Sequence, residues 1–275
     1  MVDEKALTKR EFDLLRKFVY TNAGISLSDQ KMALVQGRLS KRLRTLGMNS
    51  YKQYYDHLVS DDTGDELIHL IDAISTNVTS FFRERGQWEY LKIHIEDIFA
   101  KRSNSAFRIW SAGCSSGEEP YSIAMFLLEN LPAVSVRQCK ILATDISADI
   151  LRRATSGRYV AKNVEPLPKN YVSKYFDRDR KSESYQIKAF VREMVLFRLF
   201  NLVYGNFSLF TNPFDMIFCR NVMIYFDTPT RDKLIAEFAR VLPPGGLLFI
   251  GHSESLTRNN KLFRMIQPSI YERIG

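Results

Sequence analysis

The chain has 275 residues, 45% of them apolar, so it is long enough to bury one large or two ordinary hydrophobic cores. No apolar run reaches the roughly 18 residues that a membrane-spanning helix needs, and the opening residues MVDEKALTKREF are too charged for a signal peptide, so we expect a cytoplasmic protein without membrane insertion. The net charge of +8 favours an acidic partner, although charge alone does not distinguish nucleic acid, anionic lipid and acidic protein.

Up to about Arg85 the sequence has the apolar spacing of helices. The periodic positions are Phe12, Leu15 and Val19; Met32, Val35, Leu39, Leu43 and Leu46; and Leu67, Leu70, Ile71 and Ile74. Breaks near Gly24, Gly47 and Gly64 separate these groups. We therefore predict an all-α N-terminal domain over residues 1–76.

One of these helices, predicted over QKMALVQGRLSKRLRTLG, is basic on one face. Helical geometry places Lys31, Arg38, Lys41 and Arg42 within a sector of roughly 100°, opposite the apolar positions. Such a stripe is commonly a solvated surface, and it can also be a docking site for an acidic partner.

The segment NVTSFFRERGQW, residues 77–88, follows the helical pattern. Its adjacent phenylalanines and nearby arginines suit a helix cap, a linker or a ligand clamp. Because the pattern of the chain changes here, we predict a linker, with Phe81 and Phe82 packing the following domain against the helical one.

Residues 89–275 alternate short apolar runs with helical stretches. FRIWSAG, CKILATDIS, FDMIFCRNV and LLFIGHS have the length of buried strands, which predicts a parallel sheet covered by helices. Such a sheet binds its ligands at the carboxyl ends of its strands. SYQIKAFV and MVLFRLF read as strands beside the charged turn DRDRKSES, so we predict a small antiparallel insert at about residues 158–200.

The first strand end is followed by SAGCSSGEEPYS. Gly113 and Gly117 let the backbone approach a flat ligand, and Glu118 or Glu119 opens the next helix. The spacing is neither that of a dinucleotide-binding turn nor that of a phosphate-binding loop. An ordinary turn with acidic residues in the first helical turn would look the same.

Asp145 ends the second apolar run, where related folds place an acid that accepts hydrogen bonds from ribose hydroxyls. It could instead cap the following helix, a position for which Ser147 is equally suitable. A glycine-containing turn without a pyrophosphate motif, together with this acid, indicates a nucleoside that lacks a phosphate tail. S-adenosylmethionine fits that description.

Other chemistries find less support in the sequence. Cys114, Cys139 and Cys219 lack the spacing of a zinc site or a disulfide framework, so we expect no metal. We interpret His252, in GHSES, as structural, and CSSGE is not the elbow of a serine hydrolase. CRNV stands where amino-methylating DNA enzymes carry an aromatic-flanked proline motif, so we expect no nucleic-acid partner.

Five segments of the chain resemble the chemotaxis receptor methyltransferase family, CheR. In order along the chain they are STNVTSFFRE, IWSAGCSSGEEPYSIA, ATDIS, FDMIFCRNVMIYFD and LPPGGLLFIGHSE. The resemblance implies a doubly wound, Rossmann-like class I methyltransferase domain over residues 89–275 with the small antiparallel β insert, preceded by the all-α domain. It also implies an enzyme that uses S-adenosylmethionine, releasing S-adenosyl-L-homocysteine, to methylate glutamate side chains in the cytoplasmic methylation region of methyl-accepting chemoreceptors.

Position by position, the resemblance assigns a site. The implied cofactor-binding residues are Asn77, Thr79, Arg83, Glu119, Asp145, Asn201, Leu202, Arg220 and Asn221, and the implied catalytic residues are Arg83, Arg220 and Tyr225. A glutamate carboxylate is already ionised at pH 7, so the enzyme must supply alignment and exclusion of water rather than a general base. An arginine or a tyrosine can hold one carboxylate oxygen while the other attacks. The ordinary alternatives are a salt-bridged Arg220 and a Tyr225 packed by its ring.

The resemblance also bears on partners. Because receptor methylation regions in this family are acidic coiled coils, it favours receptor docking for Lys31, Arg38, Lys41 and Arg42. Family members that bind a receptor's C-terminal pentapeptide carry extra glycine-containing residues in the insert, and the turn here has no glycine, so we predict a pentapeptide-independent member. We also expect a monomer. Two alternatives remain: a scaffold that binds S-adenosylmethionine without turnover, and a methyltransferase of another protein carboxylate.

Overall fold

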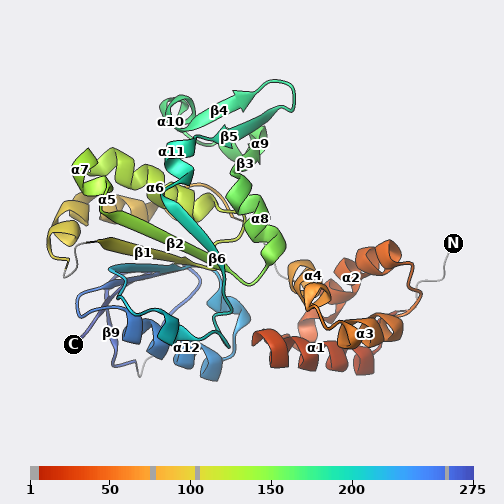
Figure 1. Cartoon of the computed structure of the whole chain (residues 1–275). Coiled ribbons are helices and arrows are strands. Elements are labelled where there is room, and N and C mark those ends of the chain that lie inside the picture. Colours follow the sequence, from red (N-terminus) through yellow and green to blue (C-terminus); the bar gives the residue numbers. More distant parts are fainter. Residues whose placement is uncertain (1–5, 75–78, 103–105, 258–259) are drawn as a thin grey trace. The chain divides into compact units, whose positions relative to one another are not determined.

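The computed structural model describes residues 6–74, 79–102, 106–257 and 260–275 (Figure 1). The chain divides into two compact units. The first comprises the residues up to 78 together with Tyr225–Thr230, and the second comprises Thr79–Ile224 and Arg231–Gly275. The predicted helical domain, residues 1–76, does not include the six residues Tyr225–Thr230 that the structure assigns to the first unit.

The first unit is helical. It contains α1 (Lys9–Ala23), a 3₁₀ turn η1 (Asp29–Lys31), α2 (Met32–Leu46), α3 (Tyr51–Ser60) and α4 (Asp65–Ile74). Helix α1 begins with a capping box, in which Thr8 Oγ1 accepts from Glu11 N at 3.3 Å and Glu11 Oε2 accepts from Thr8 N at 2.9 Å. Phe12, Leu15 and Val19 are buried in α1 as their spacing predicts, so the all-α character of this unit is confirmed.

The second unit is built on a seven-stranded sheet of order β6-β2-β1-β7-β8-β10-β9. The strands are β1 (Phe107–Ala112), β2 (Cys139–Asp145), β6 (Val195–Leu199), β7 (Met216–Cys219), β8 (Leu247–Ile250), β9 (Phe263–Gln267) and β10 (Ile270–Arg273). β6, β2, β1, β7 and β8 are parallel, and β10 is antiparallel to both of its neighbours. The order reverses between β1 and β7, so their carboxyl ends form the topological switch point of a doubly wound sheet.

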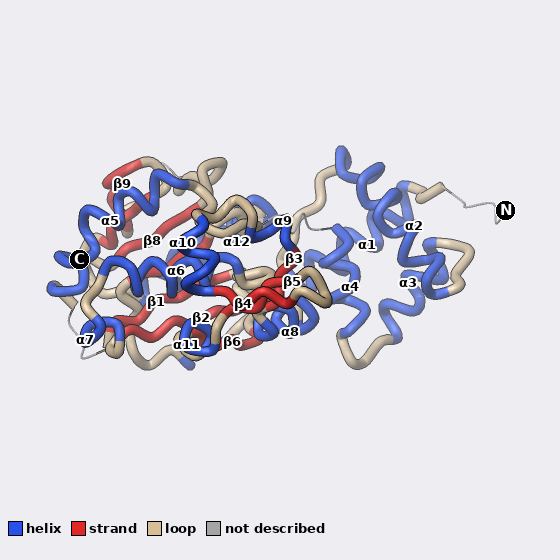
Figure 2. Tube along the Cα trace, turned by 90° about the horizontal axis from the view of Figure 1, so that it is seen from above, coloured by secondary structure: helices blue, strands red, loops and turns tan. Residues whose placement is uncertain are grey.

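Helices cover both faces of this sheet (Figures 1 and 2). They are α5 (Arg85–Ala100), α6 (Glu118–Asn130), α7 (Ala133–Val136), α8 (Ala148–Ser156) and α12 (Thr228–Val241), with 3₁₀ turns η2 (Phe207–Leu209) and η3 (Met223–Tyr225). Ile109 of β1 packs in the core with Leu91 of α5 and Leu127 of α6. The next residue, Trp110, points to the other face, where its ring centroid lies 5.5 Å from that of Phe238 in α12.

The antiparallel insert is smaller than predicted. Its sheet has the order β3-β5-β4, with β3 (Arg158–Val160), β4 (Phe176–Asp179) and β5 (Ser184–Ile187), and the short helices around it are α9 (Ala161–Val164), α10 (Lys169–Tyr175) and α11 (Ala189–Arg192). The placement of MVLFRLF in the insert is wrong, because this segment forms β6 and pairs in parallel with β2, beginning at Ile141 opposite Val195. Helix α11 returns the chain to the main sheet, and an apolar run does not specify its partner strand.

The predicted linker is tied to the second unit. Residues 79–84 form a loop, and α5 takes in the last residues of the predicted linker. The ring centroid of Phe81 lies 4.9 Å from that of Tyr159, and the centroid of Phe82 lies 5.1 Å from that of Trp88. These contacts lie inside the second unit, so they do not support the expectation that the two phenylalanines hold the domains together.

Candidate active site

The turn after β1 brings the backbone close to the turn after β7. Gly113 N and Cys114 N both donate to Thr144 O, at 2.8 and 2.9 Å, which fastens the turn to β2. Gly113 has a φ of +84°, and a Cβ built on it would lie 2.4 Å from Val222 Cγ2. The glycine is therefore needed both for its backbone conformation and for this close approach.

Asp145 organises the same edge from the end of β2. Its Oδ2 accepts from Ser115 N at 2.9 Å, and its Oδ1 accepts from Ser147 N at 3.1 Å. Ser147 Oγ accepts from Ile150 N at 3.2 Å, so Ser147 rather than Asp145 caps α8. The end of β6 joins this edge, because Phe200 N donates to Asp145 O at 3.0 Å.

The two adjacent acids at the start of α6 have different surroundings. Glu119 Oε1 accepts from Ser111 Oγ of β1 at 2.7 Å. Glu118 accepts instead from Ser116 Oγ at 2.6 Å and from Asn163 Nδ2 of α9 at 3.1 Å. Glu119 is thus the acid that faces the strand ends, which supports its choice over Glu118 as a cofactor residue.

Arg220, directly after β7, is a buried cation whose side chain is 2% exposed. Its Nε lies 3.3 Å from Glu84 Oε2, and its Nη1 lies 3.5 Å from Glu119 Oε2. Its Nη2 donates to the carbonyl oxygen of Arg83. One guanidinium thereby joins the loop before α5, the end of β7 and the start of α6, and the salt-bridged state considered for Arg220 is the one observed.

The charge of Glu119 depends on this arrangement. Burial raises the pKa of its carboxyl above the ordinary value, while Arg220 and the hydrogen bond from Ser111 act in the opposite direction; nearby Glu84 raises the pKa and nearby Arg83 lowers it. With a raised pKa, Glu119 loses its negative charge at a higher pH than an exposed glutamate when the solution is acidified.

A second buried acid, Glu254, fixes the turn after β7. It accepts from Asn221 N at 2.8 Å, Gly251 N at 2.6 Å and Ile224 N at 3.1 Å. Burial raises the pKa of this carboxyl, and the backbone hydrogen bonds oppose that rise. The ends of β7 and β8 are therefore held together by one side chain.

His252 lies beside this turn but takes part mainly through its backbone. Its N–H donates to Glu84 Oε1 at 3.1 Å, and its side chain is 57% exposed. This placement agrees with the structural interpretation of His252, since the reaction considered above needs no general base.

Backbone strain is concentrated at this edge. Four residues other than glycine have a left-handed conformation here: Phe82 (φ 51°), Glu84 (φ 63°), Ser115 (φ 49°) and Asn221 (φ 60°). They are four of the six such residues in the part of the chain that the structure describes. Each costs about 1–3 kcal/mol, and such residues cluster where a site requires a particular geometry.

Two buried polar atoms indicate where a ligand would bind. Ser115 Oγ and Asn221 Oδ1 have no hydrogen-bond partner within the described residues. They belong to the turns after β1 and β7, on the two sides of the switch point, and a buried polar atom normally has a partner. With the carboxylates of Asp145 and Glu119 at the same strand ends, the residues present fit a polar, positively charged nucleoside such as S-adenosylmethionine.

The turn after β6 supplies the remaining predicted cofactor residues of this edge. Asn201 Oδ1 accepts from Val203 N at 2.8 Å and Tyr204 N at 3.2 Å, which shapes the turn, and Leu202 is buried. An apolar side chain beside a shaped turn suits the flat face of an adenine ring, so these contacts are consistent with the predicted role.

The predicted linker and catalytic residues do not all lie in the same unit, and one of them is not described by the structure. Asn77 lies outside the described residues. Thr79 and Arg83 are half-buried in the loop before α5. Tyr225 belongs to the first unit, where Lys31 Nζ lies 5.4 Å from the centroid of its ring, so its catalytic role stays a prediction.

The predicted docking residues of α2 do not share one environment. Arg42 Nε and Nη2 lie 3.0 and 2.5 Å from the two carboxylate oxygens of Glu66, which is 4% exposed, so Arg42 balances a buried charge of α4. Arg38 Nη1 donates to Ala73 O at 3.2 Å. Lys41 is exposed. The cationic stripe is thus partly structural.

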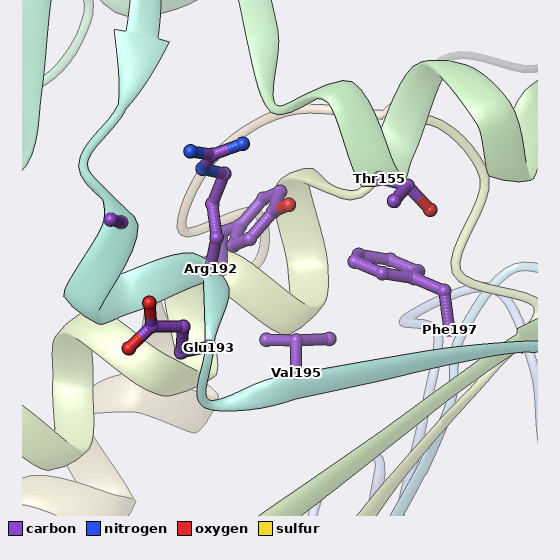
Figure 3. A pocket seen from close by; sticks show the side chains of 7 residues that line it. Thr155, Arg192, Glu193, Val195 and Phe197 are labelled. Atoms are coloured by element: carbon purple, nitrogen blue, oxygen red, sulfur yellow. The ribbon is translucent and has the colours of Figure 1, made fainter.

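A separate pocket of about 280 Å³ lies beside α6, α8, α11 and β6 (Figure 3). Its lining residues are Tyr121, Thr155, Ala189, Arg192, Glu193, Val195 and Phe197. None of them is a predicted site residue, so the switch-point site and this pocket are distinct.

Among the described residues, no group of three His, Cys, Asp or Glu side chains could hold a metal ion. No described helix is long and apolar enough to cross a membrane.

A doubly wound sheet whose strand ends carry these acids and this buried arginine, without a phosphate-binding loop, defines an S-adenosylmethionine-dependent methyltransferase domain of class I. Residues 77–271 match the family "CheR methyltransferase, SAM binding domain", and residues 10–75 match "CheR methyltransferase, all-alpha domain". The chain belongs to the CheR methyltransferase family.

Curated relatives are similar over nearly their whole length. A "Chemotaxis protein methyltransferase" of Borreliella burgdorferi is 42% identical, with 97% of this chain and 95% of that protein covered. "Chemotaxis protein methyltransferase 2" of Vibrio cholerae is 38% identical, with 96% and 92% covered, and the "Chemotaxis protein methyltransferase" of Escherichia coli is 36% identical, with 98% and 93% covered.

Sequence reasoning missed three residues that shape the site: Glu84, Ser115 and Glu254. Glu84 directly follows Arg83, and Glu254 stands in the GHSES segment. The available signal was the arginine at the end of β7, because a buried arginine needs a nearby carboxylate. Nothing in the sequence indicates which of the many acids is that partner.

Proposed function

We propose that the protein transfers the methyl group of S-adenosylmethionine to glutamate side chains of methyl-accepting chemoreceptors, forming glutamate methyl esters. The carrying observation is the family match over both units, joined to a switch point that holds Asp145, Glu119 and Arg220 together. S-adenosylmethionine supplies an electrophilic methyl group on a sulfonium. The residues of the chain bind, orient and exclude water.

The chemistry agrees with this site. The pKa of a glutamate is about 4.3, so the attacking carboxylate is ionised and needs no base. Arg220 is committed to Glu84 and Glu119, so we assign Arg83 to holding the substrate carboxylate, and the catalytic role of Tyr225 stays a separate prediction. Removing water from that carboxylate and aligning it with the methyl group are the main contributions expected of the enzyme.

The direct test is to incubate the protein with methyl-labelled S-adenosylmethionine and receptor methylation regions and to measure base-labile label. Label in the receptor, released by mild base, is the expected result. Binding of the cofactor without any transfer would favour the scaffold, and labelling of an unrelated protein instead of receptors would favour another carboxylate substrate.

We also propose that Lys31, Arg38, Lys41 and Arg42 face the acidic receptor surface. Lys41 is the informative position, because it is exposed, whereas reversing Arg42 would also strand the buried Glu66. An exposed ion pair contributes about 0.2–1 kcal/mol, and a charge reversal both removes this attraction and adds a repulsion of similar size. Lys41→Glu should therefore lower kcat/KM for receptors about 2- to 30-fold.

The control for Lys41→Glu is Lys52→Glu, a charge reversal of another exposed lysine, on α3 and outside the stripe, whose Nζ lies 3.8 Å from a carboxylate oxygen of exposed Asp56. Methyl transfer should be measured at low and high salt, since the difference should shrink as salt screens it. An equal loss for both variants, or a loss of cofactor affinity with Lys41→Glu, would contradict the docking role.

The proposal extends to the location of the protein, its oligomeric state and its mode of receptor binding. We place the protein in the cytoplasm as a monomer that acts without a receptor pentapeptide. Pentapeptide independence is supported by the β4–β5 turn, which has no glycine and is closed by Asp179 accepting from Lys181 N at 3.0 Å. Micromolar affinity for such a peptide, or a dimer in sedimentation, would contradict these assignments.

A further inference from the structure

We propose that Glu84 is a positioning residue of this site, whose carboxylate holds Arg220 so that the guanidinium is shared between Glu84 and Glu119. The inference rests on the proposed function, because it assigns the shared arginine to cofactor binding. Glu84 acts through its neighbours and not by contact with reacting atoms.

The carboxylate of Glu84 is nearly buried and contacts two other segments of the chain. Its side chain is 8% exposed, and its two oxygens contact different partners: Oε2 lies 3.3 Å from Arg220 Nε, and Oε1 accepts from His252 N at 3.1 Å. The carboxylate thereby ties the loop before α5 to the turns after β7 and β8. The left-handed φ of 63° at this residue shows that the backbone is held in an unfavourable conformation to place this side chain.

Because the guanidinium of Arg220 is rigid, its contact with Glu84 determines how it can contact Glu119. A guanidinium is a planar fork of five N–H donors, so directing one edge fixes the others. With Nε toward Glu84 and Nη2 on the carbonyl oxygen of Arg83, only Nη1 is left to face Glu119, at 3.5 Å. Glu119 therefore meets one nitrogen of a restrained arginine, at 3.5 Å, instead of the two-nitrogen edge of the fork.

Removal of the Glu84 charge should change that balance. Arg220 would then be free to turn its full fork toward Glu119 and neutralise it. The amino group of S-adenosylmethionine or S-adenosylhomocysteine is cationic, so a neutralised acid would attract it less. The groups that set the charge of Glu119 are Arg220, Ser111, Glu84 and Arg83, and Glu84 is the one among them that raises its pKa.

The experiment measures S-adenosylhomocysteine binding by calorimetry from about pH 5 to pH 8 for the full chain and its variants. In the unaltered protein, affinity should fall on acidification as Glu119 takes up a proton. Glu84→Gln should weaken binding about tenfold at neutral pH and move the midpoint of that fall to lower pH. A purely structural role would weaken binding without moving the midpoint, and that result would overturn the proposal.

Two further variants complete the design. Glu89→Gln removes a carboxylate that is 60% exposed on α5, and it should leave affinity and midpoint unchanged. Glu84→Asp keeps the charge and tolerates a left-handed backbone but is shorter, so it should keep the midpoint while weakening binding. If Glu84→Gln does not fold, unaltered affinity in Glu84→Asp alone would overturn the proposal. Unaltered affinity in Glu84→Asp and Glu84→Gln would overturn the proposal. If the unaltered protein binds the ligand but methylates no receptor, the proposed function fails while the binding arms still test Glu84.

Discussion

Arg220→Ala should abolish methyl-ester formation and lower the free energy of unfolding by about 3–5 kcal/mol. The guanidinium is buried between Glu84 and Glu119, at 3.3 and 3.5 Å, and its removal leaves two carboxylates buried without their shared counter-ion. Denaturant unfolding at neutral pH measures the stability loss, and the labelled-methyl assay with receptors measures the activity.

The pH dependence identifies the cause of the Arg220→Ala loss. Arg220 lowers the pKa of Glu119, so that pKa should rise further without the arginine, and a carboxylate with a raised pKa destabilises the fold once the pH exceeds its unfolded value. The stability difference from the unaltered protein should therefore be largest near pH 8 and shrink toward about pH 5, as Glu119 takes up a proton. A difference that does not vary with pH would contradict the uncompensated charges.

Arg220→Lys is the matched control, because it keeps one positive charge but loses the planar fork. It should retain more stability than Arg220→Ala and show a weaker pH dependence. Near-normal methyl-ester formation by Arg220→Ala, with unchanged cofactor affinity, would remove Arg220 from the site altogether.

Gly113→Ala should be the second most damaging change, with a loss of about 2–5 kcal/mol in unfolding free energy. A left-handed backbone costs an alanine about 1–2 kcal/mol, and the new Cβ, 2.4 Å from Val222 Cγ2, adds an overpacking cost of about 1–3 kcal/mol. Thermal or denaturant unfolding measures the sum. Cofactor binding should fall as well, since the turn that carries Ser115 must shift.

The two contributions to the Gly113→Ala loss can be separated. Gly245→Ala is the control for conformation alone, because Gly245 has a φ of +82° and nothing within 4 Å of an added Cβ. The Gly113→Ala, Val222→Ala double variant should recover the steric part and keep the conformational part. If Gly113→Ala were no more damaging than Gly245→Ala, the close approach of the two turns would not be a constraint.

The sequence predicts the order of the elements well because the hydrophobic patterns are strong. Helical spacing identifies the first unit, and the alternation of apolar runs with helices identifies the doubly wound sheet. The error at β6 shows the limit of such patterns: Val195–Leu199 has the composition of a strand, but its partner, β2, is determined by where α11 directs the chain. Strand pairing is a tertiary property that a local pattern does not contain.

The candidate site was predictable only in part for a similar reason. Asp145 and Glu119 stand at strand and helix ends, where position along the chain indicates a role. Glu84 and Glu254 act through partners that are 136 and 33 residues away, at Arg220 and Asn221. No spacing rule connects such pairs, and only the folded backbone brings them together.

The six residues Tyr225–Thr230 make the two units inseparable by a single cut. Ser26 N donates to Tyr225 O at 2.7 Å, and Tyr20 Oη donates to Asp227 at 2.9 Å, so this segment has hydrogen-bond partners from the N-terminal part of the sequence. A chain that began at residue 79 would keep this segment and lose its partners. The helical unit is therefore assembled from two separate parts of the sequence, and neither part alone contains all of its contacts.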